Sequence, residues 1–206
     1  MFRKLFILFS LFFLMTGCSS KTIQTELPKK GEKIAVLNTE SGQIKIRLFP
    51  KVTPKAVENF TKLIEQKKYN GNIFHRVVPN FVIQAGDFEN KDGTGGYSWQ
   101  GEGTEIEDEI TEELKHIKGS VAMAKKGGAK SYGSQFYISV VDNHFLDGEY
   151  TIFGQVFEGM DTVEKISKLR TNGMGQPQLI KNMKTYQAEQ KALIKEVKII
   201  TVDSKQ

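Results

Sequence analysis

Residues Phe74–Phe88 read FHRVVPNFVIQAGDF, in which two short apolar runs lie on either side of Pro79-Asn80. Short runs rich in β-branched and aromatic residues, separated by a turn signal, predict two buried strands joined as a hairpin. Three polar side chains, Arg76, Gln84 and Asp87, interrupt this apolar setting. Burying such groups without partners is costly. The pattern therefore allows two interpretations, a structural ion pair of Arg76 with Asp87 or another acid, or a functional site.

Four further motifs follow this stretch. They read DGTGG at 92–96, GSVAMA at 119–124, GSQFYI at 133–138 and FLDGEYTIFG at 145–154. Together with the opening stretch, and in this order, they resemble the cyclophilin family of peptidyl-prolyl cis-trans isomerases. The resemblance covers about Lys33 to Leu169, with a last strand near Val197 to Val202. Several separate motifs in the right order make it specific.

The periodicity of apolar residues predicts a mainly β domain. Ile34–Leu37 and the alternating Gln43–Leu48 read as a hairpin, and further strands are expected at 119–124, 135–140, 152–157 and 197–202. Thr53 and Pro54 predict a helix start with a capping hydroxyl, and a second amphipathic helix is expected from Met160 to Leu169. Many short strands with two helices suit a barrel without free edges. We therefore expect a closed eight-stranded antiparallel β-barrel capped by two α-helices.

Residues 1–17 are expected to be an export signal rather than part of the fold. Arg3 and Lys4 precede an apolar run that is too short for a membrane span, which needs roughly 20 apolar residues. The one cysteine of the chain, Cys18, follows directly. The stretch LMTGC resembles a bacterial lipoprotein signal, which implies lipidation of Cys18 and a place on the extracytoplasmic face of a cell membrane. Polar residues 18–33 are then expected to be the lipidated N-terminus and a flexible tether, followed by the isomerase domain at 34–206.

Composition excludes several classes of protein. The chain has 206 residues, 39% hydrophobic and 26% charged, which suits one soluble domain with short appendages. A net charge of +5 without a dense basic stripe argues against nucleic acid binding. We expect a monomer without cofactor.

The sequence also offers little for nucleophilic or metal chemistry. No GxSxG elbow occurs, and the three histidines are scattered without a metal-binding motif. The glycines of 92–96 match neither the P-loop nor the dinucleotide fingerprint. The acid-rich stretch 102–113 lacks the ligand spacing of a calcium loop, so we expect it to be a solvated acidic face and predict no metal site.

Prolyl isomerisation needs neither a nucleophile nor a metal. The peptide bond resists rotation because of resonance, and a donor aimed at the nitrogen lone pair of the twisted state would favour rotation. Arginine suits this role because it is always charged and carries several N–H groups. The resemblance implies that Arg76 is this donor.

The resemblance also implies the roles of the surrounding residues. Phe81 and Gln84 act with Arg76 as catalytic residues. The substrate-binding residues implied are Val82, Ala124, Lys125, Gln135, Tyr137, Phe145, Leu146 and Tyr150. Phe136 and Phe153, in contrast, are expected to be ordinary core residues. The partners implied are proline-containing polypeptides, together with the membrane through the lipid on Cys18.

Several of these positions depart from the family pattern. Val82 stands in place of methionine and Tyr137 in place of phenylalanine, so the pocket is expected to differ in shape and polarity. Lys125 and Lys126 predict a positive rim that favours acidic peptides. Phe145 stands where many members have tryptophan, which implies weak cyclosporin binding.

The sequence thus predicts a membrane-tethered bacterial cyclophilin that isomerises bonds before proline in exported or surface proteins. An alternative from another class is a surface chaperone that binds proline-containing segments without needing turnover. If folding assistance persisted without Arg76, the chaperone would be favoured over the isomerase.

Overall fold

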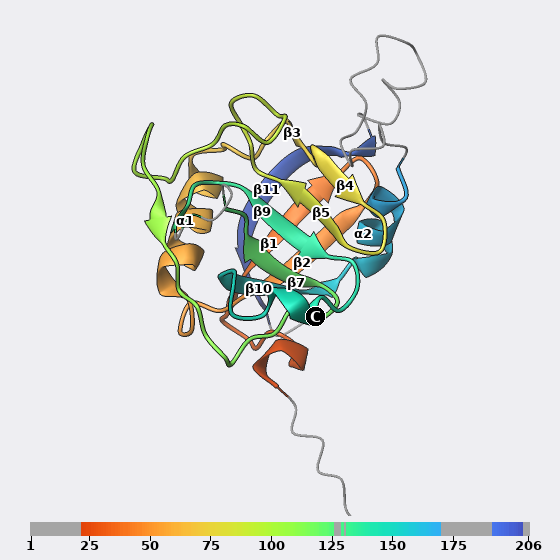
Figure 1. The fold of residues 1–206 in the computed structure, drawn as a ribbon. Helices are drawn as coiled ribbons and strands as arrows, with labels where there is room; N and C mark the ends of the chain where they lie inside the picture. The colour runs from red at the N-terminus through yellow and green to blue at the C-terminus, as the bar shows by residue number, and fades with distance from the viewer. Residues whose placement is uncertain (1–21, 126–128, 130, 170–190, 204–206) are drawn as a thin grey trace, which may run out of the picture.

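The computed structural model describes residues 22–125, 129, 131–169 and 191–203. Within them, one antiparallel sheet curls around an apolar core, and the helices α1 (Pro54–Glu65) and α2 (Met160–Ser167) lie at its opposite ends (Figure 1). In order across this nine-stranded sheet the strands are β3 (Asn72–Ile73), β11 (Leu193–Thr201), β1 (Lys33–Thr39), β2 (Gln43–Leu48), β10 (Ile152–Glu158), β7 (Ser120–Met123), β9 (Phe136–Ser139), β5 (Val82–Ala85) and β4 (Arg76–Val78). Two short strands, β6 (Ile106–Glu107) and β8 (Ser131–Tyr132), pair separately, and two 3-10 turns are η1 (Ile23–Thr25) and η2 (His144–Leu146).

This sheet corrects the expectation of a closed eight-stranded barrel. Its order begins at β3 and ends at β4, and within the described ranges no backbone pairing joins these two edge strands. The chain runs from β3 through Phe74 and His75 into β4 without a turn. The two strands therefore follow one another along the chain instead of lying side by side, and the sheet is an open, curled half-barrel.

The expected hairpin and first helix are confirmed, but the helix cap is not the expected one. β1 pairs with β2, and α1 begins at Pro54. The hydroxyl of Thr53 donates to the carbonyl of Ile152 (3.1 Å) instead of capping the helix. The carboxylate of Glu109 accepts hydrogen bonds from the backbone N–H groups of Lys55 (3.1 Å) and Ala56 (2.8 Å). An acid at a helix N-terminus also interacts favourably with the helix dipole.

Helix α1 closes one end of the curled sheet with aromatic contacts. The ring of Phe60 lies 5.1 Å from that of Tyr69, 5.3 Å from Phe136 and 4.9 Å from Phe153, centroid to centroid. All four side chains are fully buried. The expectation that Phe136 and Phe153 are core residues is therefore confirmed, and the opposite face of the sheet is left for the site.

Residues 22–33, which belong to the expected tether 18–33, lie against the domain. Gln24 is buried, its amide donates to the carbonyl of Lys115 (2.8 Å), and the N–H of Lys115 donates back to it (2.8 Å). Arg47 of β2 donates to the carbonyl of Ile23 (2.9 Å) and to the carboxylate of Glu32 (3.1 Å). These bonds fix the segment at both ends.

The predicted export signal at 1–17 and the predicted lipidation site Cys18 lie outside the described residues. In the part of the chain that is described, no helix combines the length and the apolar character required to cross a bilayer.

Candidate functional site

The register of the sheet brings distant residues into one row. Arg76 of β4 lies opposite Gln84 of β5, Gln84 lies opposite Tyr137 of β9, and Tyr137 lies opposite Ala122 of β7. Residues directly opposite one another in a sheet share a face. The hairpin of β4 and β5 and the distant strand β9 thus place a guanidinium, an amide and an aromatic ring side by side.

A pocket of about 140 Å³, here called the Phe81 pocket, opens on this row. Val82 belongs to it because residues two apart on a strand share a face. The lining residues are Arg76, Phe81, Val82, Gln84, Ala124, Lys125, Tyr137, Leu146 and Tyr150. All residues predicted for the site are therefore brought together around this pocket, except Gln135 and Phe145. What each of them does stays a prediction.

Arg76 lies half-buried beside the aromatic wall of the Phe81 pocket. Its guanidinium carbon is 5.6 Å from the centre of the Phe81 ring, and its Nη1 donates to Oε1 of Gln84 (3.4 Å). Among the described residues Arg76 forms no ion pair within 4.0 Å. Most of its N–H groups therefore remain available to a ligand in the pocket.

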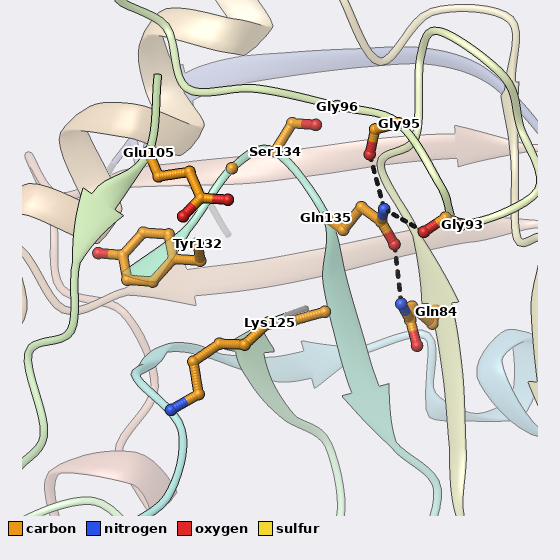
Figure 2. Close-up of a pocket in the computed structure, with 11 residues that line it drawn as sticks. Gln84, Gly93, Gly95, Gly96, Glu105, Lys125, Tyr132, Ser134 and Gln135 are labelled. Atoms are coloured by element: carbon orange, nitrogen blue, oxygen red, sulfur yellow. Dashed lines mark hydrogen bonds between the residues drawn. The ribbon is translucent and has the colours of Figure 1, made fainter. Parts of the chain in front are cut away.

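A chain of amides holds this arginine from behind. Gln84 donates to Oε1 of Gln135 (2.9 Å), and Gln135 donates to the carbonyls of Gly93 (2.9 Å) and Gly95 (2.7 Å), as Figure 2 shows. Both N–H groups of the Gln135 amide are thus used, which fixes its oxygen toward Gln84. Gln84 in turn presents its own oxygen to Arg76. The resemblance implied that both glutamines belong to the site, Gln84 as a catalytic residue and Gln135 as a substrate-binding residue.

Asp87 fixes the glycine loop at the far end of that chain. Its carboxylate is fully buried and accepts backbone N–H groups at 2.9–3.3 Å. Burial alone would raise the pKa of Asp87, but the bonds from residues such as Asn90, Gly95 and Gly93 outweigh it and lower the pKa to about 2. The donors are Glu89, Asn90, Asp92, Gly93 and Gly95. The predicted alternative, an ion pair of Asp87 with Arg76, is therefore wrong.

A second pocket of about 260 Å³ adjoins the first and is called here the Glu105 pocket. It shares Gln84, Ala124 and Lys125 with the Phe81 pocket, and Gln135 lies in its wall. Its remaining lining residues are Gly93, Gly95, Gly96, Glu105, Tyr132, Gly133 and Ser134 (Figure 2). Sequence reasoning missed Glu105 and Tyr132, because the first sits in an acidic run and the second in a polar loop.

The rim beside Lys125 is less positive than the sequence suggested. The ammonium of Lys125 lies 2.9 Å from the carboxylate of Asp108, and both side chains are only 13% exposed. The same nitrogen lies 5.1 Å from the centre of the Tyr150 ring. The acidic run, expected to be wholly solvated, thus neutralises Lys125, while Lys126 lies outside the described residues.

Phe145 extends the apolar surface at the mouth of the Phe81 pocket. Its side chain is 72% exposed, and its ring stacks on that of Phe81 with centroids 5.7 Å apart. An exposed aromatic ring stacked on a pocket wall is a suitable contact for a further residue of a bound peptide.

A cluster behind the pocket was also missed. His116 is fully buried between Asp147 and Tyr137, with Nδ1 3.0 Å from Oδ1 of Asp147 and Nε2 2.8 Å from the hydroxyl of Tyr137. The sequence offered no signal, because Tyr137 and Asp147 belong to two separate motifs and His116 to neither. Within the described ranges, no group of three or more His, Cys, Asp or Glu side chains is placed to hold a metal ion.

The site and the fold can now be compared with known proteins. Residues 34–196 match the family described as "Cyclophilin type peptidyl-prolyl cis-trans isomerase/CLD". The chain belongs to this family.

Individual relatives agree with this assignment. A Dictyostelium discoideum protein named peptidyl-prolyl cis-trans isomerase cypE is 40% identical over 141 residues, covering 68% of this chain and 88% of that protein. The mouse "Peptidylprolyl isomerase domain and WD repeat-containing protein 1" is 41% identical over 150 residues, but the chain spans only 23% of its length. The relatives named here are eukaryotic, so they do not test the predicted bacterial lipoprotein form.

A solved structure supports the fold of this cyclophilin. A cyclophilin type peptidyl-prolyl cis-trans isomerase from Cryptosporidium parvum, crystallised in the presence of the dipeptide Ala-Pro, matches with a TM-score of 0.71 at 31% identity. The match covers 82% of this chain and 99% of that one. The predicted cyclophilin fold, mainly β with two helices, is thereby confirmed.

Proposed function

We propose that this cyclophilin accelerates cis-trans rotation about the peptide bond that precedes proline. The observation that carries the proposal is the place of Arg76, which stands at a pocket with an apolar wall, is held by Gln84 and forms no ion pair with the described residues. The uncatalysed rotation takes tens to hundreds of seconds, so an enzyme has a large barrier to lower.

The arginine would act on the nitrogen of the twisted bond. As the bond rotates, conjugation is lost, and the nitrogen becomes pyramidal and gains a lone pair. A donor aimed at this lone pair binds the twisted state better than the planar one, and only such differential binding speeds the step. A hydrogen bond from a charged donor contributes about 1.5–3 kcal/mol, which is roughly one to two powers of ten in rate.

The Phe81 pocket would hold the proline ring while the preceding residue turns. Its volume of about 140 Å³ is well below the roughly 300–1,000 Å³ of sites that enclose whole small molecules, so it suits a single small ring. Phe81, Val82, Tyr137 and Leu146 supply apolar surface there. Holding the ring in place leaves rotation of the other side as the remaining motion.

Substitution of Arg76 tests the proposal. In a protease-coupled assay on a proline peptide, Arg76→Ala should lower kcat/KM by about a hundredfold, the larger end of the range above. Arg76→Lys keeps the charge but not the planar fork of donors, and should recover only part of the activity. Thermal unfolding should be nearly unchanged in both, because the side chain is half-buried, forms no ion pair with the described residues and makes only one long hydrogen bond, to Gln84. Wild-type turnover in Arg76→Ala would refute the mechanism.

The exposed ring of Phe145 also favours a second candidate, a chaperone that binds proline-containing segments without turnover. Its stack on Phe81 forms an apolar surface that does not depend on Arg76. If Arg76→Ala lost turnover but still raised the refolding yield of a proline-containing client, this second function would be supported. Loss of both effects would assign the assistance to catalysis.

We further propose that the protein acts, as a monomer, on exported or surface proteins from the extracytoplasmic face of a membrane, held by a lipid on Cys18. Arg3 and Lys4, the apolar run and the cysteine support this. Because residues 22–33 are docked, three residues separate Cys18 from the docked part, and an extended chain of that length spans only about 10 Å. The domain would lie close to the bilayer. Labelled palmitate should enter the wild type but not Cys18→Ser, and only the variant should leave the membrane fraction.

A further inference from the structure

Four side chains form a continuous polar chain from solvent to the wall of the Phe81 pocket. His144 is 58% exposed, and its Nδ1 lies 3.0 Å from Oδ2 of Asp147. The other oxygen of Asp147 lies 3.0 Å from Nδ1 of His116, and Nε2 of His116 lies 2.8 Å from the hydroxyl of Tyr137. Of these four side chains, only that of Tyr137 lines the Phe81 pocket.

The chemistry of these groups fixes the direction of the hydrogen bonds. Burial alone would raise the pKa of Asp147, but bonds from the backbone N–H of His116 and from the two histidine rings outweigh it and lower the pKa, so the carboxylate is ionised and only accepts. Nδ1 of His116 must therefore donate to it. In the neutral ring the other nitrogen, Nε2, is then an acceptor. Burial lowers the pKa of His116 despite the bond to Asp147, which favours this neutral ring.

The hydroxyl of Tyr137 consequently donates to His116. A tyrosine in an apolar wall needs a partner for its hydroxyl, since leaving it unpaired costs about 1–3 kcal/mol. His116 supplies that partner on the side away from the pocket. The apolar ring of Tyr137 can then face the pocket, although the residue carries a polar group.

His116 is itself held rigidly. Its backbone N–H donates to Oδ1 of Asp147 (2.6 Å), and its carbonyl accepts from the N–H of Asn143 (2.6 Å). Its ring is nearly parallel to that of Tyr137 and lies edge-on to that of Tyr150, at centroid distances of 6.0 and 6.3 Å. It therefore touches two residues of the pocket wall without lining the pocket.

We infer that His116, oriented by Asp147, is a positioning residue that fixes the Tyr137 wall of the Phe81 pocket through the tyrosine hydroxyl. The inference rests on the proposed function, since it assigns the pocket to the proline of the substrate. Because the wall contacts the ring before and during rotation, its loss should weaken binding in the ground state and the transition state alike. Such a change raises KM and leaves kcat nearly unchanged.

A double-mutant cycle on the full chain tests this. His116→Phe keeps a ring but leaves the hydroxyl of Tyr137 unpaired, and should raise KM, and the Kd of a proline peptide measured by NMR titration, by about tenfold. In the background of Tyr137→Phe, which removes that hydroxyl, the same His116→Phe should change KM and Kd by less than about twofold, because the bond from His116 to the pocket wall is already absent. His144→Gln is the matched control, because it removes the other histidine that contacts the carboxylate of Asp147. It keeps the bonds from Asp147 to His116 and from His116 to Tyr137, so its KM should equal that of the wild type.

The outcomes separate this inference from the proposed function. An equal rise of KM and Kd in both backgrounds, or a loss of thermal stability without any change in KM, would show that His116 is merely structural. If His116→Phe does not fold, Asp147→Ala replaces it. This variant removes the acceptor of His116 Nδ1, and the side chain of Asp147 is 18% exposed. It should raise KM and Kd in the wild-type background and not in the Tyr137→Phe background. If the wild type bound the peptide without isomerising it, the proposed function would be refuted but this inference would not. The double-mutant cycle would then compare the Kd values of the peptide alone. Absence of peptide binding would overturn both.

Discussion

The buried carboxylate of Asp87 gives the sharpest stability prediction, since it fixes the loop on which the whole amide chain to Arg76 rests. The change is Asp87→Asn, which keeps the size of the side chain. One carboxylate oxygen becomes an amide NH₂ that faces backbone donors, so some of the N–H groups of residues 89–95 lose their acceptor.

The pKa of Asp87 sets the expected magnitude. Its fall from the usual 3.8 to about 2 corresponds to about 2.5 kcal/mol of preferential stabilisation of the ionised group in the folded state. Asp87→Asn should therefore lower the free energy of unfolding by about 2–3 kcal/mol, which is roughly 5–10 °C in Tm for a chain of this size. Loosening of Gly93 and Gly95 should also free Gln135, so kcat/KM should fall by roughly tenfold.

Urea denaturation of both proteins at pH 7, with linear extrapolation, measures the difference. The folded-state pKa is lowered, so the contribution is fully present above about pH 4 and is lost as the pH falls toward about 2. The gap between wild type and variant should close over that range. Asp142→Asn is the control, because exposed Asp142 accepts one backbone bond, from Lys118 (2.7 Å), and should cost under about 0.5 kcal/mol. Equal stability of the two variants at pH 7 would refute the role given to Asp87.

Three further predictions concern the pocket wall, the docked segment and the histidines. Phe81→Ala should raise KM at least fivefold and lower the free energy of unfolding by about 1–3 kcal/mol. This is less than the loss for a fully buried phenylalanine, because the ring of Phe81 is only half-buried. Peptide titration checks the first effect and urea denaturation the second. Gln24→Ala should cost about 1–3 kcal/mol, since both bonds to the backbone of Lys115 are lost, while kcat stays unchanged in the peptide assay. Burial lowers the pKa of His75 and of His116 in the folded state. As the pH falls below about 6.5, the unfolded chain therefore binds protons before the folded one, and the free energy of unfolding should decline. Denaturation midpoints at pH 5 above those at pH 7.5 would contradict this.

Much of the site could be predicted because its residues lie within local motifs. Arg76, Phe81 and Gln84 come from one hairpin, whose strand period and turn are legible along the chain. A short hairpin fixes its own register, so the residues that face one side together are already determined. The two motifs that contain Ala124 and Tyr137 could then be added by resemblance, and the structure does place those residues at the same pocket.

The errors concern charged and polar groups. Asp87 looked like a partner for Arg76, Lys125 looked like a free cation, and Thr53 looked like a helix cap. Each residue has a different partner in the fold, namely the backbone of the glycine loop, Asp108 and the carbonyl of Ile152. A hydrogen bond or an ion pair depends on distances of a few ångströms, and composition or periodicity carries no such distance.

Periodicity and turn chemistry were enough for the longer strands and the two helices, because they act between neighbours in the chain. The family and most residues of the Phe81 pocket came from the resemblance of several motifs in order. The curled, open sheet, the docking of Gln24, the pairing of Lys125 with Asp108 and the support of Tyr137 by His116 emerged only with the assembled fold. These features join segments that are far apart in sequence, and a polar group takes whichever partner the packed chain brings within reach.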